Sequence, residues 1–385
     1  MDLSIVRMNE EVNDMRIGII GAGIGGLTAA IALKAQGHEV EIFEKRHVLK
    51  QPGVGLGIGG NAIRALKQFG IDAAIREKGK VLLECQFRTE RDDLLNTLML
   101  SLSEEENVTI QRADLHDILL EYNRAPIHLI KDVIRIKDYA NPTLVLRDGS
   151  KFHYDLIIAA DGIHSNIRRQ MYTSSDAIYQ GYTCFRGTSI NVGIDDKAAI
   201  EYWGEAGRFG IVPLKDNQVY WFCCMNAKER DPEFRNYNKK KLMHYFKDFP
   251  DEVKETIAQT IGDPVHHDIY DINPLKSFHK GRVVLIGDAA HATTPNMGQG
   301  ASLAIEDAVC LANQIKHYPL DEALKVYDNL SVKHTKKVIL KSRKIGQSAQ
   351  LENKLLINAR NRVLRRIPAS LLERQTFFLS HRHIN

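Results

Sequence analysis

The sequence predicts an α/β fold with an inserted, mostly antiparallel β-sheet domain and a helical C-terminal segment. Residues 17–20 form a short apolar run typical of a buried parallel strand, and residues 28–35 then follow a helical pattern. Between residues 180 and 275, strand-like runs follow one another without this alternation, and a buried-strand pattern returns at 282–286. The 385 residues exceed one ordinary core, which favours two closely joined domains.

The first strand leads into a glycine-rich turn with the spacing of a dinucleotide-binding fingerprint. Gly21 would make the tight turn, Gly23 would let the backbone approach a pyrophosphate, and Gly26 would let helix and strand pack closely. A second strand at 39–44 ends in Glu44, where a carboxylate can accept a hydrogen bond from a ribose hydroxyl. Strand, glycines, helix and acid together favour a Rossmann-like nucleotide-binding domain over a glycine-rich turn without a ligand.

Several further elements are expected before residue 130. Glycine-rich residues 53–60 predict turns or a close approach of the backbone to another group, and Asn61 would cap a helix at 62–69. Residues 81–100 alternate loosely in hydropathy and are compatible with strands, and a helix is expected over 112–120.

Two later strands also end in an acidic residue. The apolar run 156–160 is followed by Asp161, and the run 282–286 is followed, after one glycine, by Asp288. Because ligands bind at the carboxyl ends of parallel strands, both acids are expected at the sheet edge that carries the fingerprint.

The remaining pattern defines the domain organisation. Strands are expected at 181–190, 199–203, 207–212 and 219–226, and helices at 239–247, 251–261, 300–315 and over most of 321–364. We therefore expect the first part of the nucleotide-binding domain at 1–175, the inserted domain at 176–275, the second part of the nucleotide-binding domain at 276–320 and a helical region at 321–385.

Composition indicates a soluble globular protein, with 44% hydrophobic and 26% charged residues. No apolar run approaches the roughly 20 residues that span a bilayer, so no stable membrane insertion is expected. The acidic, polar N-terminus lacks the pattern of a signal peptide. Five scattered cysteines without a CxxC pair favour reduced thiols over disulfides or a metal site, and we expect a cytoplasmic protein.

The formal net charge of +4 is unevenly distributed, because residues 331–366 are strongly basic. A solvated helix face that packs on the main body is the favoured interpretation of this segment, and contact with acidic lipid or a partner is the alternative. Nothing in the sequence indicates specific nucleic-acid recognition.

Three strand-end motifs stand in order along the chain: GAGIGGL at 21–27, DGIHSNIR at 161–168 and GDAAHATTPNMGQG at 287–300. Together they resemble the group A flavoprotein monooxygenases, the family of p-hydroxybenzoate and salicylate hydroxylases. The resemblance extends to about residue 345. It implies a Rossmann-like, GR2-type FAD-binding domain, with the inserted sheet as substrate domain.

The resemblance also implies which residues contact FAD. They are Gly21, Gly23 and Gly26 at the pyrophosphate, Glu44 at the adenosine ribose, Asp288 at the ribityl or pyrophosphate region, Gly298, Gln299, Gly300 and Ala301 at the pyrimidine edge of the ring, and Lys45, Arg112, Val133 and Asp161 elsewhere on the cofactor. Asp161 belongs to a motif tied to both FAD and NAD(P)H. Taken alone, Arg112 is better interpreted as a surface charge. No metal site is expected, because the paired histidines His266 and His267 lack a third ligand at suitable spacing.

The chemistry implied by the resemblance is that of the cofactor. NADH or NADPH would reduce FAD and, in the absence of a second GxGxxG motif, would dock only transiently. O2 would then form a flavin C4a-hydroperoxide, whose distal oxygen is transferred to an electron-rich carbon of a small aromatic or heteroaromatic substrate.

Within the family, the middle region is most similar to bacterial FAD-dependent urate hydroxylases. The similarity includes Arg208 and Tyr220, which correspond to an arginine and a tyrosine of the substrate site in those enzymes. A strand-surface pair is the alternative interpretation. Cys184 stands where these relatives have asparagine, which argues against urate itself as the substrate.

Other functions stay open on the sequence. A monooxygenase of a larger polycyclic or isoprenoid substrate, of the tetracycline-inactivating or epoxidase type, is the nearest alternative. An FAD-binding reductase or dehydrogenase belongs to a different class. In each case the partner is a small molecule, and the protein would be a monomer or homodimer.

Overall fold

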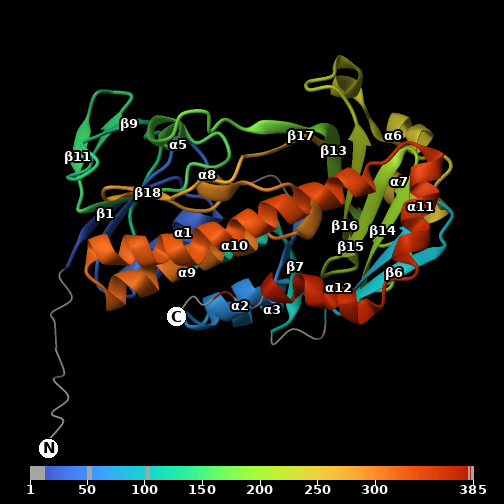
Figure 1. The fold of residues 1–385 in the computed structure, drawn as a ribbon, viewed down its shortest axis with the longest axis horizontal. Helices are drawn as coiled ribbons and strands as arrows, with labels where there is room; N and C mark the ends of the chain where they lie inside the picture. Colours follow the sequence, from blue (N-terminus) through green and yellow to red (C-terminus); the bar gives the residue numbers. More distant parts are fainter. Residues whose placement is uncertain (1–13, 50–53, 101–104, 380–381, 383–385) are drawn as a thin grey trace, which may run out of the picture.

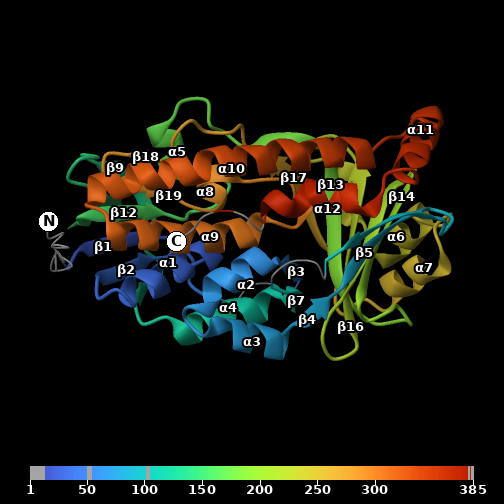
Figure 2. The ribbon, with the colours of Figure 1, turned by 60° about the horizontal axis from the view of Figure 1, so that its bottom comes forward.

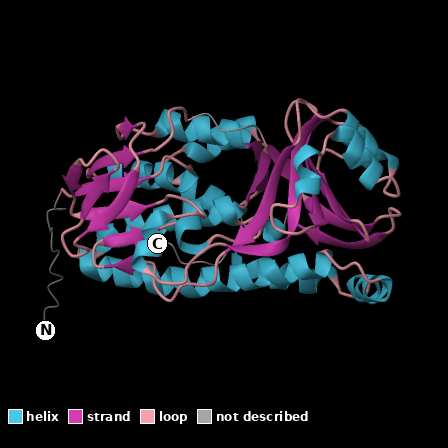
Figure 3. Cartoon of the chain, turned by 90° about the horizontal axis from the view of Figure 1, so that it is seen from above, coloured by secondary structure: helices cyan, strands magenta, loops and turns pink. Residues whose placement is uncertain are grey.

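The computed structural model describes residues 14–49, 54–100, 105–379 and 382, and it confirms the α/β fold. The N-terminal stretch that lacks a signal-peptide pattern lies almost entirely outside these residues. The molecule is elongated, with one large sheet towards each end (Figures 1 and 3). Within the described ranges, no helix combines the length and the hydropathy needed to cross a membrane.

A six-stranded sheet forms the core of the nucleotide-binding domain, in the order β18-β19-β12-β1-β2-β8. Its strands are β1 (Arg16–Ile20), β2 (Glu39–Phe43), β8 (Ile127–His128), β12 (Leu156–Ala159), β18 (His279–Lys280) and β19 (Val283–Leu285). All neighbours are parallel except β18 and β19. Its central strands are buried on both faces, as expected from their continuous apolar runs.

The order of this sheet brings the three sequence motifs together. Strands β1, β12 and β19 are parallel neighbours, and each is followed directly by one motif. The fingerprint turn, the segment around Asp161 and the segment around Asp288 therefore meet at one carboxyl edge, as predicted from the sequence.

The second large sheet has seven strands in the order β17-β13-β16-β15-β14-β5-β6. They are β5 (Glu84–Thr89), β6 (Leu94–Met99), β13 (Ile178–Ile190), β14 (Ala198–Gly204), β15 (Gly207–Pro213), β16 (Gln218–Asn226) and β17 (Val265–Asp271). Neighbours are antiparallel, apart from the parallel pair β14 and β5. The sheet thus takes residues 84–99 from the segment 1–175, so the expected boundary at residue 176 does not enclose the whole seven-stranded sheet. The reason is the long-range pairing of β5 with β14, which no local pattern encodes.

The seven-stranded sheet has two different faces because its side chains alternate. One face packs aromatic and aliphatic side chains, among them Phe209, Trp221 and Phe185, against the helices α6 (Lys239–Tyr245) and α7 (Asp251–Ala258). The other face is turned towards the nucleotide-binding domain and forms the wall of a cavity.

Two small sheets and the remaining helices complete the fold. The sheets are β3 (Gly55–Ile58), β7 (Asn107–Gln111) and β4 (Lys80–Leu82), and β9 (Val133–Lys137), β10 (Thr143–Leu146) and β11 (Lys151–His153). The helices are α1 (Ile24–Lys34), α2 (Gly60–Lys67), α3 (Ile71–Lys78), α4 (Arg112–Tyr122), α5 (Asn166–Met171), α8 (Asp288–His291), α9 (Gly300–His317), α10 (Leu320–Ala349), α11 (Lys354–Leu364) and α12 (Ala369–Thr376), with short 3-10 turns η1 (Pro232–Asn236), η2 (Pro295–Met297) and η3 (Phe377–Leu379).

The C-terminal helices connect the two ends of the molecule. Helix α10 runs from the nucleotide-binding domain towards the seven-stranded sheet, and α12 then lies beside β6 (Figure 2). The basic segment therefore covers the main body, which is the arrangement favoured from its sequence.

Candidate active site

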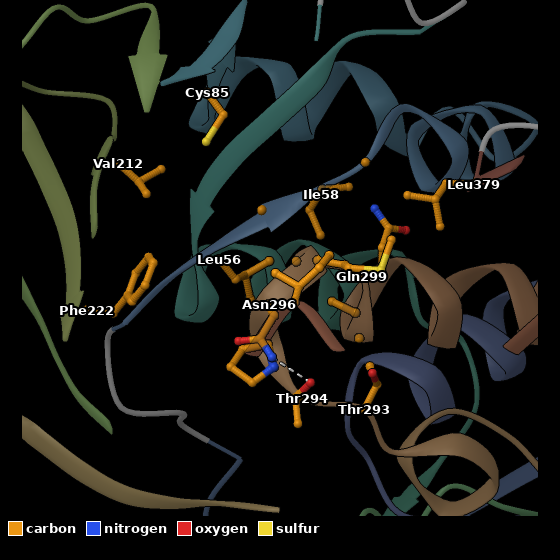
Figure 4. Close-up of a pocket in the computed structure, with 18 of the residues that line it drawn as sticks. Leu56, Ile58, Cys85, Val212, Phe222, Thr293, Thr294, Asn296, Gln299 and Leu379 are labelled. Carbon is orange, nitrogen blue, oxygen red and sulfur yellow. Dashed lines mark hydrogen bonds between the residues drawn. The ribbon is translucent and has the colours of Figure 1, made fainter. Parts of the chain in front are cut away.

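A large cavity of about 1570 Å³ lies between the carboxyl edge of the six-stranded sheet and the free face of the seven-stranded sheet. This exceeds the roughly 300–1,000 Å³ of typical small-molecule pockets, so it offers room for a cofactor and a substrate together. In Figure 4, Cys85, Val212 and Phe222 extend from the sheet side, opposite Leu56 and Ile58 of β3.

The three fingerprint glycines have three different environments. Gly21 has φ +102°, a left-handed conformation that side chains disfavour, and a Cβ there would clash with the carbonyl oxygen of Ala160. A Cβ at Gly26 would clash with the carbonyl oxygen of Gly21. Gly23 lines the cavity and has no atom within 4 Å of an added Cβ, so the backbone is open to a ligand at the start of α1.

Glu44 lies at the end of β2, next to this turn. Its Oε2 accepts from the backbone N–H of Ala22 at 2.9 Å, and its Oε1 accepts from Arg46 N–H at 2.9 Å. The carboxylate is thus fixed beside the glycine turn. Lys45 and Val133, by contrast, are not among the residues that line the cavity.

The carboxylate of Asp161 holds the start of α5. Its Oδ2 accepts from the backbone N–H of Asn166 at 2.9 Å, at the start of α5, while Oδ1 has no hydrogen-bond partner in the described part of the chain. Burial raises the pKa of Asp161, although these hydrogen bonds oppose the shift. The neighbouring Gly162, rather than Asp161, lines the cavity.

The fully buried Arg168 joins the second and third motifs. Its guanidinium donates to the carbonyl oxygens of Ile163, Asp288 and Ala289. This contact fixes the start of α8, where the carboxylate of Asp288 is exposed to the cavity.

Residues 298–301 form another part of the cavity wall, at the start of α9. Gly298 has φ +62°, and neither Gly298 nor Gly300 has an atom within 4 Å of an added Cβ. The first N–H groups of a helix are free donors at its positive end, so this segment suits an electron-rich ring edge. Arg112 also lines the cavity, and the charge of Asp288 opposes the effect of burial, which lowers the pKa of Arg112.

These features fit FAD, because two helix N-termini, an exposed carboxylate and the half-buried Arg112 surround open space at Gly23, Gly298 and Gly300. Gly23, Arg112, Asp288 and the segment 298–301 lie on this surface, with Glu44 fixed behind the turn. Among the described residues, no group of three or more His, Cys, Asp and Glu side chains is placed to hold a metal ion.

Arg208 occupies the centre of the sheet wall, with only 2% of its surface exposed. Its Nη1 forms a salt bridge with Glu201 Oε1 at 3.1 Å, and its Nη2 donates to Asn296 Oδ1 in η2. Nε has no hydrogen-bond partner among the described atoms. Arg208 is thus a fixed cation with a free buried donor at the cavity wall.

Tyr220 lies two strand positions from Phe222 on β16 and packs so closely on β3 that only glycine fits at position 55. Burial raises the pKa of Tyr220 well above its ordinary value, so its hydroxyl is neutral at physiological pH. The structure places Arg208, Tyr220 and Cys184 on the same cavity wall, together with Arg186.

The far end of the cavity is mostly apolar. Its apolar lining comes from β5, β6, β14 and the C-terminal helices: Cys85, Phe87, Leu98, Ala199, Leu364, Ile367 and Leu372. Asn96 of β6 and Ser370, Glu373 and Arg374 of α12 add polar groups to this part of the wall. This part lies beyond Arg208 and Tyr220 along the sheet, because β5 and β6 form its outer edge.

Sequence reasoning missed the partners that hold Arg208. Glu201 and Trp203 share the cavity face of β14, and Trp203 Nε1 donates to the same Glu201 oxygen at 2.8 Å. The sequence signal that could have revealed this contact is Glu201 itself, an acidic residue within the otherwise apolar strand β14. Asn296 lies inside the third motif, between the aspartate and the glycines that were singled out.

Comparison with known proteins agrees with this geometry. Residues 14–336 match the family described as FAD binding domain. The chain is 32% identical over 369 residues to the aurachin C monooxygenase/isomerase of Stigmatella aurantiaca, covering 93% of this chain and 96% of the relative. It is 29% identical to the 2-heptyl-3-hydroxy-4(1H)-quinolone synthase of Pseudomonas aeruginosa, covering 92% and 94%.

A solved structure shows the same fold with the cofactor present. The crystal structure of Klebsiella pneumoniae HpxO complexed with FAD and uric acid superposes with a TM-score of 0.87 at 28% identity, covering 95% of this chain and 97% of that one. The chain therefore belongs to the FAD-binding-domain family of group A flavoprotein monooxygenases, and it is an FAD-dependent enzyme of the aromatic hydroxylase type.

Proposed function

We propose that this enzyme hydroxylates a heteroaromatic ring that carries an apolar chain, with a 2-alkyl-4(1H)-quinolone as the preferred substrate class. The observation that carries the proposal is the shape of the cavity wall. A cationic, hydrogen-bonding centre formed by Arg208, Arg186 and Tyr220 adjoins a mostly apolar end between β5, β6 and the C-terminal helices. A compact polar ring such as urate would leave that end empty.

The relatives support this choice of substrate. The first is named for aurachin C, and the second for a quinolone with a heptyl chain and a 3-hydroxyl group. Both cover nearly the whole chain, including β5, β6 and the C-terminal helices that surround the apolar end. We therefore propose hydroxylation at the ring carbon next to the carbonyl.

The chain's own residues bind the cofactor and orient the substrate. Gly23 and the N–H groups at the start of α1 would hold the pyrophosphate, Asp288 and Arg112 would contact the middle of FAD, and residues 298–301 would face the flavin ring. When bound, FAD would supply the redox chemistry, taking a hydride from NADH or NADPH and delivering one oxygen atom of O2.

Arg208 and Arg186 would act on the ring rather than on the cofactor. A guanidinium beside a ring oxygen stabilises its deprotonated, electron-rich form, which assists attack on an electrophilic oxygen atom. The neutral Tyr220 hydroxyl would donate a hydrogen bond and fix the orientation of the ring. The buried sheet face and the apolar lining exclude water from the reaction.

The test is a chain-length series of 2-alkyl-4(1H)-quinolones, with urate and salicylate in the same panel. We expect 2-heptyl-4(1H)-quinolone to stimulate NADH or NADPH oxidation and to give a product one oxygen atom heavier, with KM rising as the chain is shortened. Stimulation by urate or salicylate, with none by any quinolone, would reject the substrate class and favour a small polar ring. Reduction of FAD without an oxygenated product from any compound would instead support the reductase or dehydrogenase alternative.

We also propose that the enzyme works in the cytoplasm, since all five cysteines are free and four of them are buried.

A further inference from the structure

Two cysteines lie opposite each other on the sheet face that forms the cavity wall. Cys184 on β13 is the register partner of Cys224 on the antiparallel strand β16. Both are buried, and Cys184 is among the residues that line the cavity. Cys85 also lines the cavity, but it lies on β5, separated from Cys224 by two intervening strands.

Each thiol of this pair accepts a hydrogen bond from a guanidinium group. Arg186 Nε donates to Cys184 Sγ at 3.4 Å, and Arg208 Nη2 donates to Cys224 Sγ at 3.6 Å. Arg208 has Glu201 as its counter-ion. No carboxylate among the described residues lies within ion-pair distance of Arg186, so a thiolate at Cys184 would be its counter-ion.

Two guanidinium groups favour ionisation of Cys184, whereas burial and the 3.5 Å contact in which its Sγ donates to the carbonyl oxygen of Phe185 favour the thiol. The hydrogen bond from Cys224, together with the charges of Arg186 and Arg208, lowers the pKa of Cys184, although burial opposes the shift. Burial raises the pKa of Cys224 and also that of Cys85. The other titratable or charged groups on this face of the sheet, from its own and neighbouring strands, are Tyr182, Tyr220, Glu201 and His267.

We propose that Cys184 and Cys224 form a peroxide-reactive dithiol at the substrate end of the cavity. The Cys184 thiolate attacks hydrogen peroxide; an S–O bond forms, the O–O bond breaks, and hydroxide leaves. The Cys224 thiol then attacks the sulfenic acid, so that an S–S bond forms, the S–O bond breaks and water leaves. In total, two thiols lose two electrons to one peroxide, which gives one disulfide and two water molecules.

The strand geometry is compatible with this bond. Directly opposite residues of antiparallel strands have Cβ atoms about 4.5–5.5 Å apart, whereas a disulfide needs about 3.5–4.5 Å. A small approach of β13 and β16 is therefore sufficient. The bond would weaken the sulfur acceptor of Arg186 and one of the acceptors of Arg208, which keeps Glu201 and Asn296.

The test uses the FAD-loaded enzyme, exposed to added hydrogen peroxide at several pH values and then digested for peptide mass mapping after alkylation of the remaining thiols. We expect a product two hydrogen atoms lighter that links the peptides of Cys184 and Cys224 and is reversed by dithiothreitol. Because a thiolate is the reactive species, Cys184 should be oxidised at pH 7 at least about tenfold faster than Cys85.

Matched variants separate the pair from general thiol oxidation. Cys85→Ser should leave the cross-link unchanged, and Cys224→Ser should leave Cys184 as a sulfenic acid that a dimedone probe captures. Arg186→Gln should move the pH dependence of Cys184 oxidation towards alkaline pH. Oxidation of Cys184 no faster than that of Cys85, or further oxidation of Cys184 without a link to Cys224, would overturn the proposal. Because this readout needs no turnover, it is independent of the proposed substrate.

Discussion

Arg208 on β15 donates a hydrogen bond through Nη2 to the side-chain oxygen of Asn296 in the η2 turn. Asn296 in turn donates to Thr294 Oγ1 at 2.9 Å and to the backbone carbonyl of Ser342 on α10 at 2.8 Å (Figure 4 shows the contact with Thr294). The arginine at the centre of the seven-stranded sheet is thus tied to the loop that leads into residues 298–301 and to α10, which connects the two ends of the molecule. A substrate at Arg208 would meet a group whose position is fixed by the cofactor domain.

Replacement of Arg208 tests this arrangement. Arg208→Gln should keep FAD bound but abolish substrate-stimulated NAD(P)H oxidation, because the ring loses its cation. It should also lower the free energy of unfolding by about 3 kcal/mol, since Glu201 is left without its ion-pair partner. Flavin absorbance, stimulated oxidation and thermal unfolding are the measurements.

The matched control is Arg360, a buried arginine that stacks on Trp203 and donates to the carbonyl of Ser348 at 3.0 Å. Arg360→Gln should cost stability but keep the stimulated oxidation. If Arg208→Gln retained full stimulation, Arg208 would not belong to the substrate site.

The fingerprint glycines allow a paired test of folding against binding. Gly26→Ala should destabilise the fold by at least about 2 kcal/mol, because the new methyl group clashes with the carbonyl oxygen of Gly21. Gly23→Ala meets open space at an ordinary φ of −82°, so it should fold normally yet bind FAD at least about tenfold more weakly. Urea unfolding and flavin titration of the refolded apoprotein distinguish the two. Normal FAD affinity in Gly23→Ala would place the pyrophosphate elsewhere.

Asp288→Asn should weaken FAD binding by roughly tenfold to a hundredfold, the range for losing one hydrogen bond to a charged group. The fold should be unaffected, since this carboxylate is exposed to the cavity. Asp321→Asn, which removes an exposed carboxylate paired with Arg282, is the control and should leave flavin content unchanged. Equal flavin content in both purified variants would reject the role of Asp288.

A buried carboxylate on α9 predicts a pH dependence of stability. Burial raises the pKa of Glu306 to about 7, although the charge of Arg382 and the nearby Asn61 side chain oppose the shift. The folded state therefore binds a proton more tightly than the unfolded state, so stability falls as pH rises from about 4.5 to 7 and then levels off. This contribution is about 3 kcal/mol at most.

Glu306→Gln should remove that contribution, because glutamine does not titrate. The parent should therefore lose stability relative to the variant as pH rises from 5 to 8. Denaturant unfolding across this range measures it. A constant difference at all pH values would show that Glu306 does not titrate there.

The sequence was sufficient where the determinants are local. The spacing of Gly21, Gly23 and Gly26 predicts a strand, a tight turn and a helix within one short segment. The structure has β1, this turn and α1 at these positions. The convergence of Asp161 and Asp288 at the same edge followed from general rules for parallel sheets. The family resemblance rested on these same motifs.

The long-range features could not be derived in this way. Strand β5 pairs with β14 more than a hundred residues later in the chain, so the substrate sheet begins well before residue 176. Asp161 has the expected position, but its carboxylate serves the start of α5 rather than the cavity. The network around Arg208 depends on Glu201 and Asn296, which only the folded sheet brings together.

The most direct test of the account is turnover of 2-heptyl-4(1H)-quinolone by the FAD-loaded enzyme with NADH or NADPH under isotopically labelled O2. We predict a product heavier by one labelled oxygen atom, bound to the ring and formed in proportion to the NAD(P)H consumed. Oxidation of NAD(P)H that yields only labelled hydrogen peroxide, with the quinolone recovered unchanged, would contradict the proposed function.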